Sequence, residues 1–239
     1  MLLASSGAGA ASVDHERQYR SCLALVHSKP EDAFESALAW RDQGGGAPAE
    51  HCAALALLGL GKHAQAALRL EALADALGPE GKVSPAAVLA QAANVWLLGG
   101  EPERALAAID RALALEPGRA PLLVDRARAM GELGRHAEAL ADLDRALGLD
   151  PRDDDALAFR ASALRQLGRL DEALVSADRA LAANPDNASA RLERGLVRMQ
   201  MADLAGARAD WLETATRNAG TPAGDAAQSM LEELDLKPD

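Results

Sequence analysis

The phrase DRALALEP occupies residues 110–117 and returns as DRALGLDP at residues 144–151 and as DRALAANP at residues 178–185. The three copies are evenly spaced along the chain, and each of them ends in a proline. Alanine and leucine favour helix, whereas a proline cannot continue one. The phrase therefore predicts the end of a helix that recurs with a fixed period, as in a repeat protein.

A glycine turn precedes each copy of the phrase, at Gly100, Gly134 and Gly168. Because glycine accepts the left-handed backbone that closes a helix, each turn is expected to end one helix before the next begins. Small residues recur at two fixed positions. One lies in the helix before the turn, together with a larger apolar residue, and the other lies in the helix after the turn. These residues are Ala93, Ala127 and Ala161, then Ala105, Ala139 and Ala173, with the larger partners Trp96, Met130 and Leu164.

In these columns the sequence resembles the tetratricopeptide repeat, a helix–turn–helix unit whose length of about 34 residues equals the spacing of the phrase. The resemblance implies an all-α fold, a right-handed superhelical solenoid of antiparallel helix pairs. Four units are predicted over residues 86–221, with the bounds 86–119, 120–153, 154–187 and 188–221. The last unit departs from the pattern, because Arg198 replaces a large apolar residue and Ala219 replaces the proline. Terminal repeats are commonly atypical.

Weaker units are predicted on the N-terminal side, where residues 61–67 echo residues 134–140. We expect two degenerate units over residues 13–85, with an inserted loop at residues 78–85. Residues 1–12 are either a disordered leader or the remnant of an export signal, since Ala8-Gly9-Ala10 has the small-x-small form of a cleavage site.

A capping helix and tail are predicted over residues 222–239. Thr221 is a preferred N-cap residue, and Pro222 suits the first helical position. The leucines expected to cover the last unit are Leu231, Leu234 and Leu236.

The composition of the 239 residues narrows the class of partner. The chain has 36 acidic and 25 basic side chains and a net charge of −11, which disfavours binding to nucleic acid or to an anionic membrane. No apolar run approaches the roughly 18 residues that span a bilayer. Alanine is the commonest residue type, whereas Trp, Tyr and Phe number only 3, 1 and 2.

The resemblance implies that the first helix of each unit lines a concave groove, which binds a protein or peptide segment. The residues expected to line it are Gln91, Asn94, Leu98, Asp125, Arg128, Glu132, Asp155, Phe159, Ser162 and Arg165. One subclass of the family clamps the terminal carboxylate of chaperone tails with Lys, Asn and Arg. Here only Asn94 fits that arrangement, and Asp125 and Asp155 would repel a carboxylate. A solvated helix face is the alternative interpretation for these residues, except that for Phe159 the alternative is packing between units.

The two cysteines, Cys22 and Cys52, fall in the first helices of the two degenerate units. Neighbouring helix axes lie about 8–10 Å apart, which leaves a disulfide within reach. The alternative is a pair of buried reduced thiols. A disulfide would indicate an oxidising compartment.

Chemistry other than binding has little support in the sequence. The histidines show no metal-binding spacing, and no nucleophile elbow is present. A cluster of Cys22, His51 and Cys52 is the one arrangement on which an enzymatic or metal-binding alternative could rest. The pairs Asp110-Arg111, Asp144-Arg145 and Asp178-Arg179 recur with the period and are interpreted as a solvated outer face.

The sequence as a whole predicts a non-enzymatic interaction scaffold with no catalytic, cofactor or metal residues. We expect it to act in a bacterial envelope assembly in the periplasm, and otherwise in the cytoplasm. The alternative is a carrier of a small apolar molecule or lipid, with a cavity lined by Leu97, Leu98 and Phe159.

Overall fold

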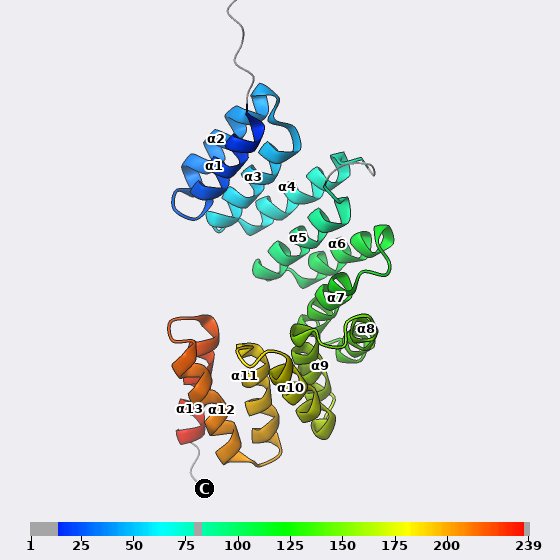
Figure 1. Cartoon of the computed structure of the whole chain (residues 1–239), viewed down its shortest axis with the longest axis vertical. Helices are drawn as coiled ribbons and strands as arrows, with labels where there is room; N and C mark the ends of the chain where they lie inside the picture. Colours follow the sequence, from blue (N-terminus) through cyan, green and yellow to red (C-terminus); the bar gives the residue numbers. More distant parts are fainter. Residues whose placement is uncertain (1–13, 79–82, 237–239) are drawn as a thin grey trace, which may run out of the picture. The chain divides into compact units, whose positions relative to one another are not determined.

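The computed structural model describes residues 14–78 and 83–236, and within them it contains thirteen α-helices, one π-helical segment and no strand (Figure 1). The expected all-α fold is confirmed. The predicted leader, the centre of the predicted inserted loop and the last residues of the tail lie outside the described residues. The elements are α1 His15–Val26, α2 Pro30–Trp40, η1 Arg41–Gly45, α3 Gly46–Gly59, α4 His63–Ala76, α5 Pro85–Leu98, α6 Pro102–Leu115, α7 Ala120–Glu132, α8 His136–Leu149, α9 Asp154–Gln166, α10 Leu170–Ala183, α11 Ala188–Gln200, α12 Leu204–Arg217 and α13 Pro222–Leu236.

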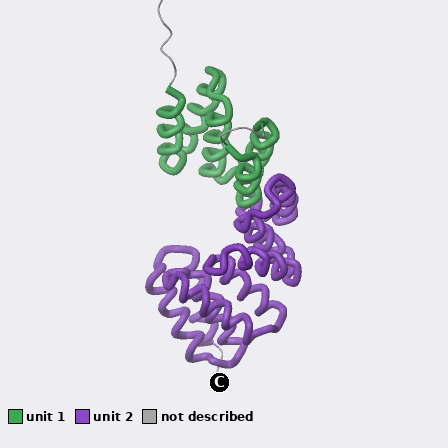
Figure 2. Tube along the Cα trace, turned by 45° about the vertical axis from the view of Figure 1, so that its right-hand side comes forward, with its two compact units in different colours: residues 1–95 green, residues 96–239 purple. Residues whose placement is uncertain are grey.

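The chain divides into two compact units, Met1–Val95 and Trp96–Asp239, and the division falls inside α5 (Figure 2). In the first unit, α1 packs against α2 and α3, while α3 also packs against α2 and α4. In the second unit, every helix from α6 to α12 packs against the next one in the chain. Alternate helices pack together as well, α7 with α9 and α9 with α11. The helices therefore follow one another as stacked pairs within each unit.

Glycine closes the first helix of the regular pairs, as the sequence predicts. Gly100, Gly134 and Gly168 have φ angles of 72°, 71° and 74°, a region that L side chains rarely adopt. In the last pair the same turn falls on Ala202, whose φ is 64°. The fourth unit therefore carries local backbone strain that the other three avoid.

Alanine fills the places where helices come closest. The alanines in the two predicted columns, at 93, 127, 161, 105, 139 and 173, are at most 2% exposed. In the last pair the corresponding residue is Gly195, which lies directly beneath the indole of Trp211. An added methyl group there would collide with the ring, so Gly195 allows Trp211 to be fully buried.

The capping helix α13 forms as predicted. Thr221 Oγ1 accepts a hydrogen bond from the Gly224 amide at 3.3 Å, and Pro222 is the first residue of the helix. Leu231 is buried and Leu234 packs against the same cluster around Trp211. The expectation for Leu236 is wrong, because its side chain is 80% exposed at the end of the helix.

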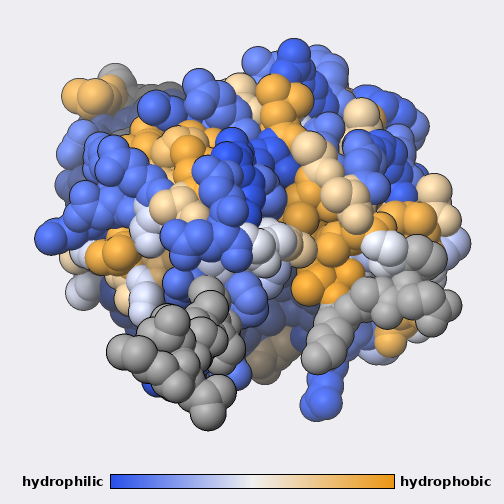
Figure 3. All heavy atoms as spheres, turned by 90° about the horizontal axis from the view of Figure 1, so that it is seen from above, coloured by the Kyte–Doolittle hydropathy of each residue, from blue (hydrophilic) through white to orange (hydrophobic). Residues whose placement is uncertain are grey.

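Some apolar side chains remain at the surface. On the face drawn in Figure 3, hydrophobic residues form patches between hydrophilic ones. Leu115, Leu149 and Val175 are each 58% exposed, which is ordinary for single apolar residues. Among the described helices, none has both the length and the apolar character needed to cross a membrane.

Candidate functional site

A cavity of about 330 Å³ opens between α7, α8 and α9 in the second unit. Arg128 and Glu132 line it from α7, and Phe159 and Ser162 line it from α9. Leu143 of α8 adds an apolar side chain. The cavity thus brings together four of the ten residues predicted for the groove, and it combines an aromatic ring with charges of both signs.

The helix register places these side chains on facing surfaces. Phe159 and Ser162 are three residues apart and therefore share one face of α9, while Arg128 and Glu132 share one face of α7. Asp153 caps the start of α9, where its carboxylate accepts a hydrogen bond from the Ala156 amide at 2.9 Å. Phe159 stays partly exposed, so its ring is available to a ligand.

Arg165, also predicted for the groove, is held by the protein itself. Its guanidinium forms an ion pair with Glu193 of α11, and the two side chains are only 12% and 11% exposed. Asp155 accepts a hydrogen bond from Asn187 Nδ2 at 3.1 Å. Neither residue lines the cavity, nor does Asp125, which lies half-buried on α7. These contacts between successive repeats were not visible in the sequence pattern.

In the first unit, the predicted residue Gln91 takes part in a chain of hydrogen bonds across three helices. The Tyr19 hydroxyl of α1 lies 2.7 Å from Nδ1 of His51 in α3, and Nε2 of His51 lies 2.7 Å from Oε1 of Gln91 in α5. A neutral His51 with its proton on Nε2 satisfies both bonds. Burial raises the pKa of the Tyr19 hydroxyl. Sequence reasoning missed Tyr19 because nothing in the repeat pattern distinguishes it.

The last two predicted groove residues, Asn94 and Leu98, both lie on α5. Asn94 donates a hydrogen bond from Nδ2 to the Ala90 carbonyl of its own helix at 3.2 Å. Leu98 is 58% exposed at the end of the helix. The residues that line the cavity beside Phe159 do not include Leu97 or Leu98, with which the carrier alternative would have formed its binding site.

Comparison with known protein families accounts for the regular part of the chain. Two tetratricopeptide repeat profiles match it, one over residues 100–165 and the other over residues 154–199. Residues 100–199 are therefore tetratricopeptide repeats. The family resemblance of the sequence is thereby confirmed, and no curated protein matches the chain in sequence.

The chain is similar to several solved structures. A MamA crystal structure is 17% identical, with a TM-score of 0.56 over 70% of this chain and 97% of the other. The MamA RS-1 ArsTM double mutant is 16% identical, with a TM-score of 0.58 over 74% of this chain and 98% of the other. The second TPR domain of human RPAP3, in complex with an HSP70 peptide, is 29% identical, with a TM-score of 0.43 over 46% and 92%. The MamA structures support the solenoid architecture.

The two cysteines of the chain form a disulfide. Cys22 of α1 is bonded to Cys52 of α3, and their Cα atoms are 6.3 Å apart. Both residues are almost completely buried, within a cluster that includes Ala33 and Ala37 of α2. The bond engages both sulfur atoms, so it removes the two thiolates on which a metal site with His51 would depend. Among the described residues, no group of three or more His, Cys, Asp or Glu side chains is suited to hold a metal ion.

Arginines that sequence reasoning overlooked connect successive repeats. Arg126, Arg160 and Arg194 each bind an aspartate 16 residues earlier, at 3.1, 2.7 and 2.9 Å. The aspartates are Asp110, Asp144 and Asp178, which are about half-exposed and so partly match the expected solvated face. Each arginine also binds a side chain 16 residues later, and these partners are the buried Asp142, Ser176 and Asp210. The sequence shows that the three aspartates recur with the period of the repeat, but it does not show which arginine binds each of them.

Proposed function

We propose that the protein is a non-enzymatic scaffold that binds an extended segment of a partner protein along the first helices of its second unit. The cavity between α7, α8 and α9 carries this proposal, because it joins a partly exposed aromatic ring to polar side chains on two successive first helices. Pockets that combine apolar walls with a few polar groups are typical binding sites. An apolar side chain of the partner would insert beside Phe159.

The charges favour an internal segment of the partner over its C-terminus. Arg128 and Glu132 line the same cavity, and Asp125 and Asp155 lie on the same two helices. A terminal carboxylate would meet these acidic groups, whereas Arg165 is already neutralised by Glu193. We therefore propose a partner segment with a central apolar residue and with side chains of both charges around it.

We further propose that the protein works in an oxidising compartment, such as the periplasm of a bacterium, as part of an envelope assembly. The support is the buried disulfide between Cys22 and Cys52, since such bonds persist mainly outside reducing cytosol. Mass spectrometry of protein isolated from its native host, before and after reduction, would test this step. Two reduced thiols in the isolated protein would contradict the assignment.

The groove is tested by cross-linking and affinity purification from the native host with two variants. Phe159→Ala removes the ring beside the cavity, and Arg128→Glu reverses a charge that lines it. We expect both variants to lose a partner that the wild-type protein retains. Val175→Ala, on a 58% exposed side chain of α10, is the matched control and should retain it. An unchanged set of partners for both groove variants would overturn the proposal.

A further inference from the structure

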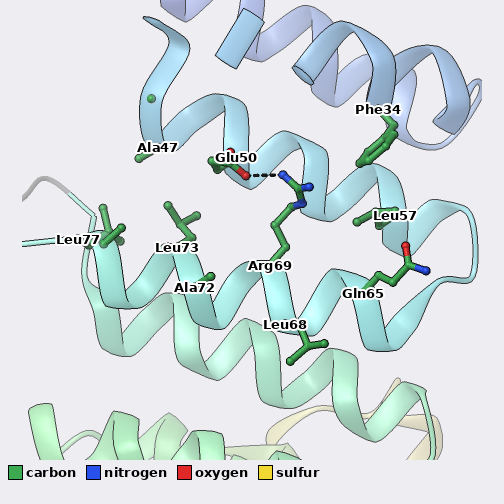
Figure 4. A pocket seen from close by; sticks show the side chains of 12 residues that line it. Phe34, Ala47, Glu50, Leu57, Gln65, Leu68, Arg69, Ala72, Leu73 and Leu77 are labelled. Atoms are coloured by element: carbon green, nitrogen blue, oxygen red, sulfur yellow. Dashed lines mark hydrogen bonds and ion pairs between the residues drawn. The ribbon is translucent and has the colours of Figure 1, made fainter. Parts of the chain in front are cut away.

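The first unit contains a larger pocket, of about 820 Å³, on the side of α3 where α2 and α4 flank it (Figure 4). Its walls are mainly apolar and include Phe34 of α2, Leu57 of α3 and Leu73 of α4. Leu68 and Ala72 lie on exposed positions of α4 at the edge of the pocket. Its volume falls within the range of roughly 300–1,000 Å³ that is common for small-molecule sites.

The charged groups of this pocket bind each other. Arg69 Nη1 lies 2.5 Å from Glu50 Oε2, and Figure 4 shows this pair bridging α4 and α3. The Arg69 guanidinium also lies over the Phe34 ring, 5.7 Å from its centroid. A charged ligand would have to compete with this pair, at a cost in desolvation, whereas a neutral ligand leaves it intact.

The equivalent place in the second unit holds a smaller cavity. Aligning Gly61 with Gly134 places Ala53 and Ala72 at the positions of Arg126 and Arg145. Both of these arginines line the corresponding cavity between α6, α7 and α8, which has a volume of only about 300 Å³. Of the two alanines, Ala72 lines the large pocket, whereas Ala53 is buried in α3 and does not line it. A pocket of about 820 Å³ in the first unit thus corresponds to a cavity of about 300 Å³ in the second.

We infer that the pocket between α2, α3 and α4 binds an uncharged, mainly aliphatic small molecule. The apolar walls select the chain of such a ligand, and the Glu50–Arg69 pair disfavours a charged head group. The wall formed by α4 runs from Gln65 to Ala76, about 16 Å at 1.5 Å per residue, which suits an extended alkyl chain. This site lies in a different unit from the cavity beside Phe159 and does not depend on the proposed scaffold function.

Calorimetric titration of the full chain with three ligands of equal chain length tests the inference. Decanol is neutral, decanoate is an anion and decyltrimethylammonium is a cation. We expect decanol to bind at one site and both charged ligands to bind at least tenfold more weakly. No binding of decanol, or binding of either charged ligand as tight as that of decanol, would overturn the inference.

Two alanine variants on the same helix locate the site. Ala72→Phe fills the pocket and should weaken decanol binding at least tenfold, whereas Ala64→Phe, on an exposed position that does not line it, should leave binding unchanged. Both positions are exposed, so thermal unfolding should be close to that of the wild type. Phe159→Ala should bind decanol normally, which separates this site from the proposed peptide groove. Equal binding by Ala72→Phe and the wild type would overturn the assignment.

Discussion

Arg126 shows how single residues connect the repeats. Its guanidinium binds Asp142 through Nε at 2.6 Å and through Nη2 at 2.9 Å, and Asp110 through Nη1 at 3.1 Å. The hydrogen bond with Asp142 is the main reason why the pKa of Arg126 is raised above its ordinary value. Asp142 is buried, so its charge depends on this partner. In the preceding repeat the same two positions are Ala92 and Ala108, both buried.

Removing Arg126 alone should therefore lower the free energy of unfolding more than removing Arg126 and Asp142 together. We expect Arg126→Ala to lower the free energy of unfolding by about 3 kcal/mol, because it leaves Asp142 buried with only the half-exposed Arg145 nearby. The double variant Arg126→Ala, Asp142→Ala reproduces the alanine pair of the preceding repeat and should recover about half of that loss or more. Urea unfolding of both single variants and of the double variant measures the coupling. Additive losses would show that the pair has no special role.

The turn residues provide a second test at this scale. Gly134 has a φ of 71°, and nothing lies within 4 Å of the place where a Cβ would be built. Gly134→Ala should therefore lower the free energy of unfolding by about 1 kcal/mol through backbone strain alone. Ala202→Gly should have a neutral or slightly stabilising effect, because it relieves the same strain in the last pair. Thermal unfolding followed by circular dichroism would decide, and a tolerated Gly134→Ala would contradict the expectation.

At the scale of elements, α11 and α12 depend on a close contact between a glycine and a tryptophan. Gly195 lies against the Trp211 ring, and the Trp211 indole donates a hydrogen bond to the Leu192 carbonyl at 3.3 Å. The ring is fully buried and supports Leu231 and Ala227 of the capping helix α13. The position of the capping helix therefore depends on the small residue in α11.

Enlarging that residue should loosen the end of the second unit. We expect Gly195→Ala to lower the free energy of unfolding by about 2 kcal/mol, because the added methyl group would collide with the fully buried ring and force it to shift. Hydrogen exchange should then speed up in α11, α12 and α13 but not in α7 or α8, as contacts in repeat proteins are mainly between neighbours. Gly148→Ala, which meets nothing within 4 Å, is the matched control and should not reproduce that loss. Equal stability of Gly195→Ala and the wild type would count against this packing.

At the scale of the whole molecule, the chain has two compact units, and only the first contains the disulfide. The bond closes a loop with a sequence separation of 30 residues and joins α1 to α3. By restricting the unfolded chain, a loop of this length adds about 3.6 kcal/mol of stability. Because both cysteines are buried, a reductant reaches them only after local opening.

Reduction should therefore affect one unit selectively. We expect the double variant Cys22→Ser, Cys52→Ser to lower the unfolding temperature of the first unit and to leave that of the second unit unchanged. Calorimetry of the variant, with reduced wild-type protein alongside, measures both effects. An equal decrease in both units would contradict this localisation.

The sequence by itself determined the repeat, its period and most of the helix ends. Proline and glycine act on the backbone within a few residues, and the alanine columns mark close helix contacts in every copy, so Gly134 or Ala127 could be interpreted without a structure. Of the residues predicted for the groove, Phe159, Arg128, Glu132 and Ser162 line one cavity, because a fixed period brings equivalent helix faces together. It could not separate Arg128 from Arg165, since both carry the same charge on a first helix.

Only the tertiary structure decided which polar side chains the protein uses for itself. Arg165 pairs with Glu193 across a distance of 28 residues in the sequence, and Arg126 links two helices on either side of its own. The pocket in the first unit is lined by the small side chain of Ala72, whereas Arg145 stands at the equivalent position of the second unit and lines a smaller cavity. Such features depend on the volume and charge of residues that meet only after the helices have packed, and no local pattern records them.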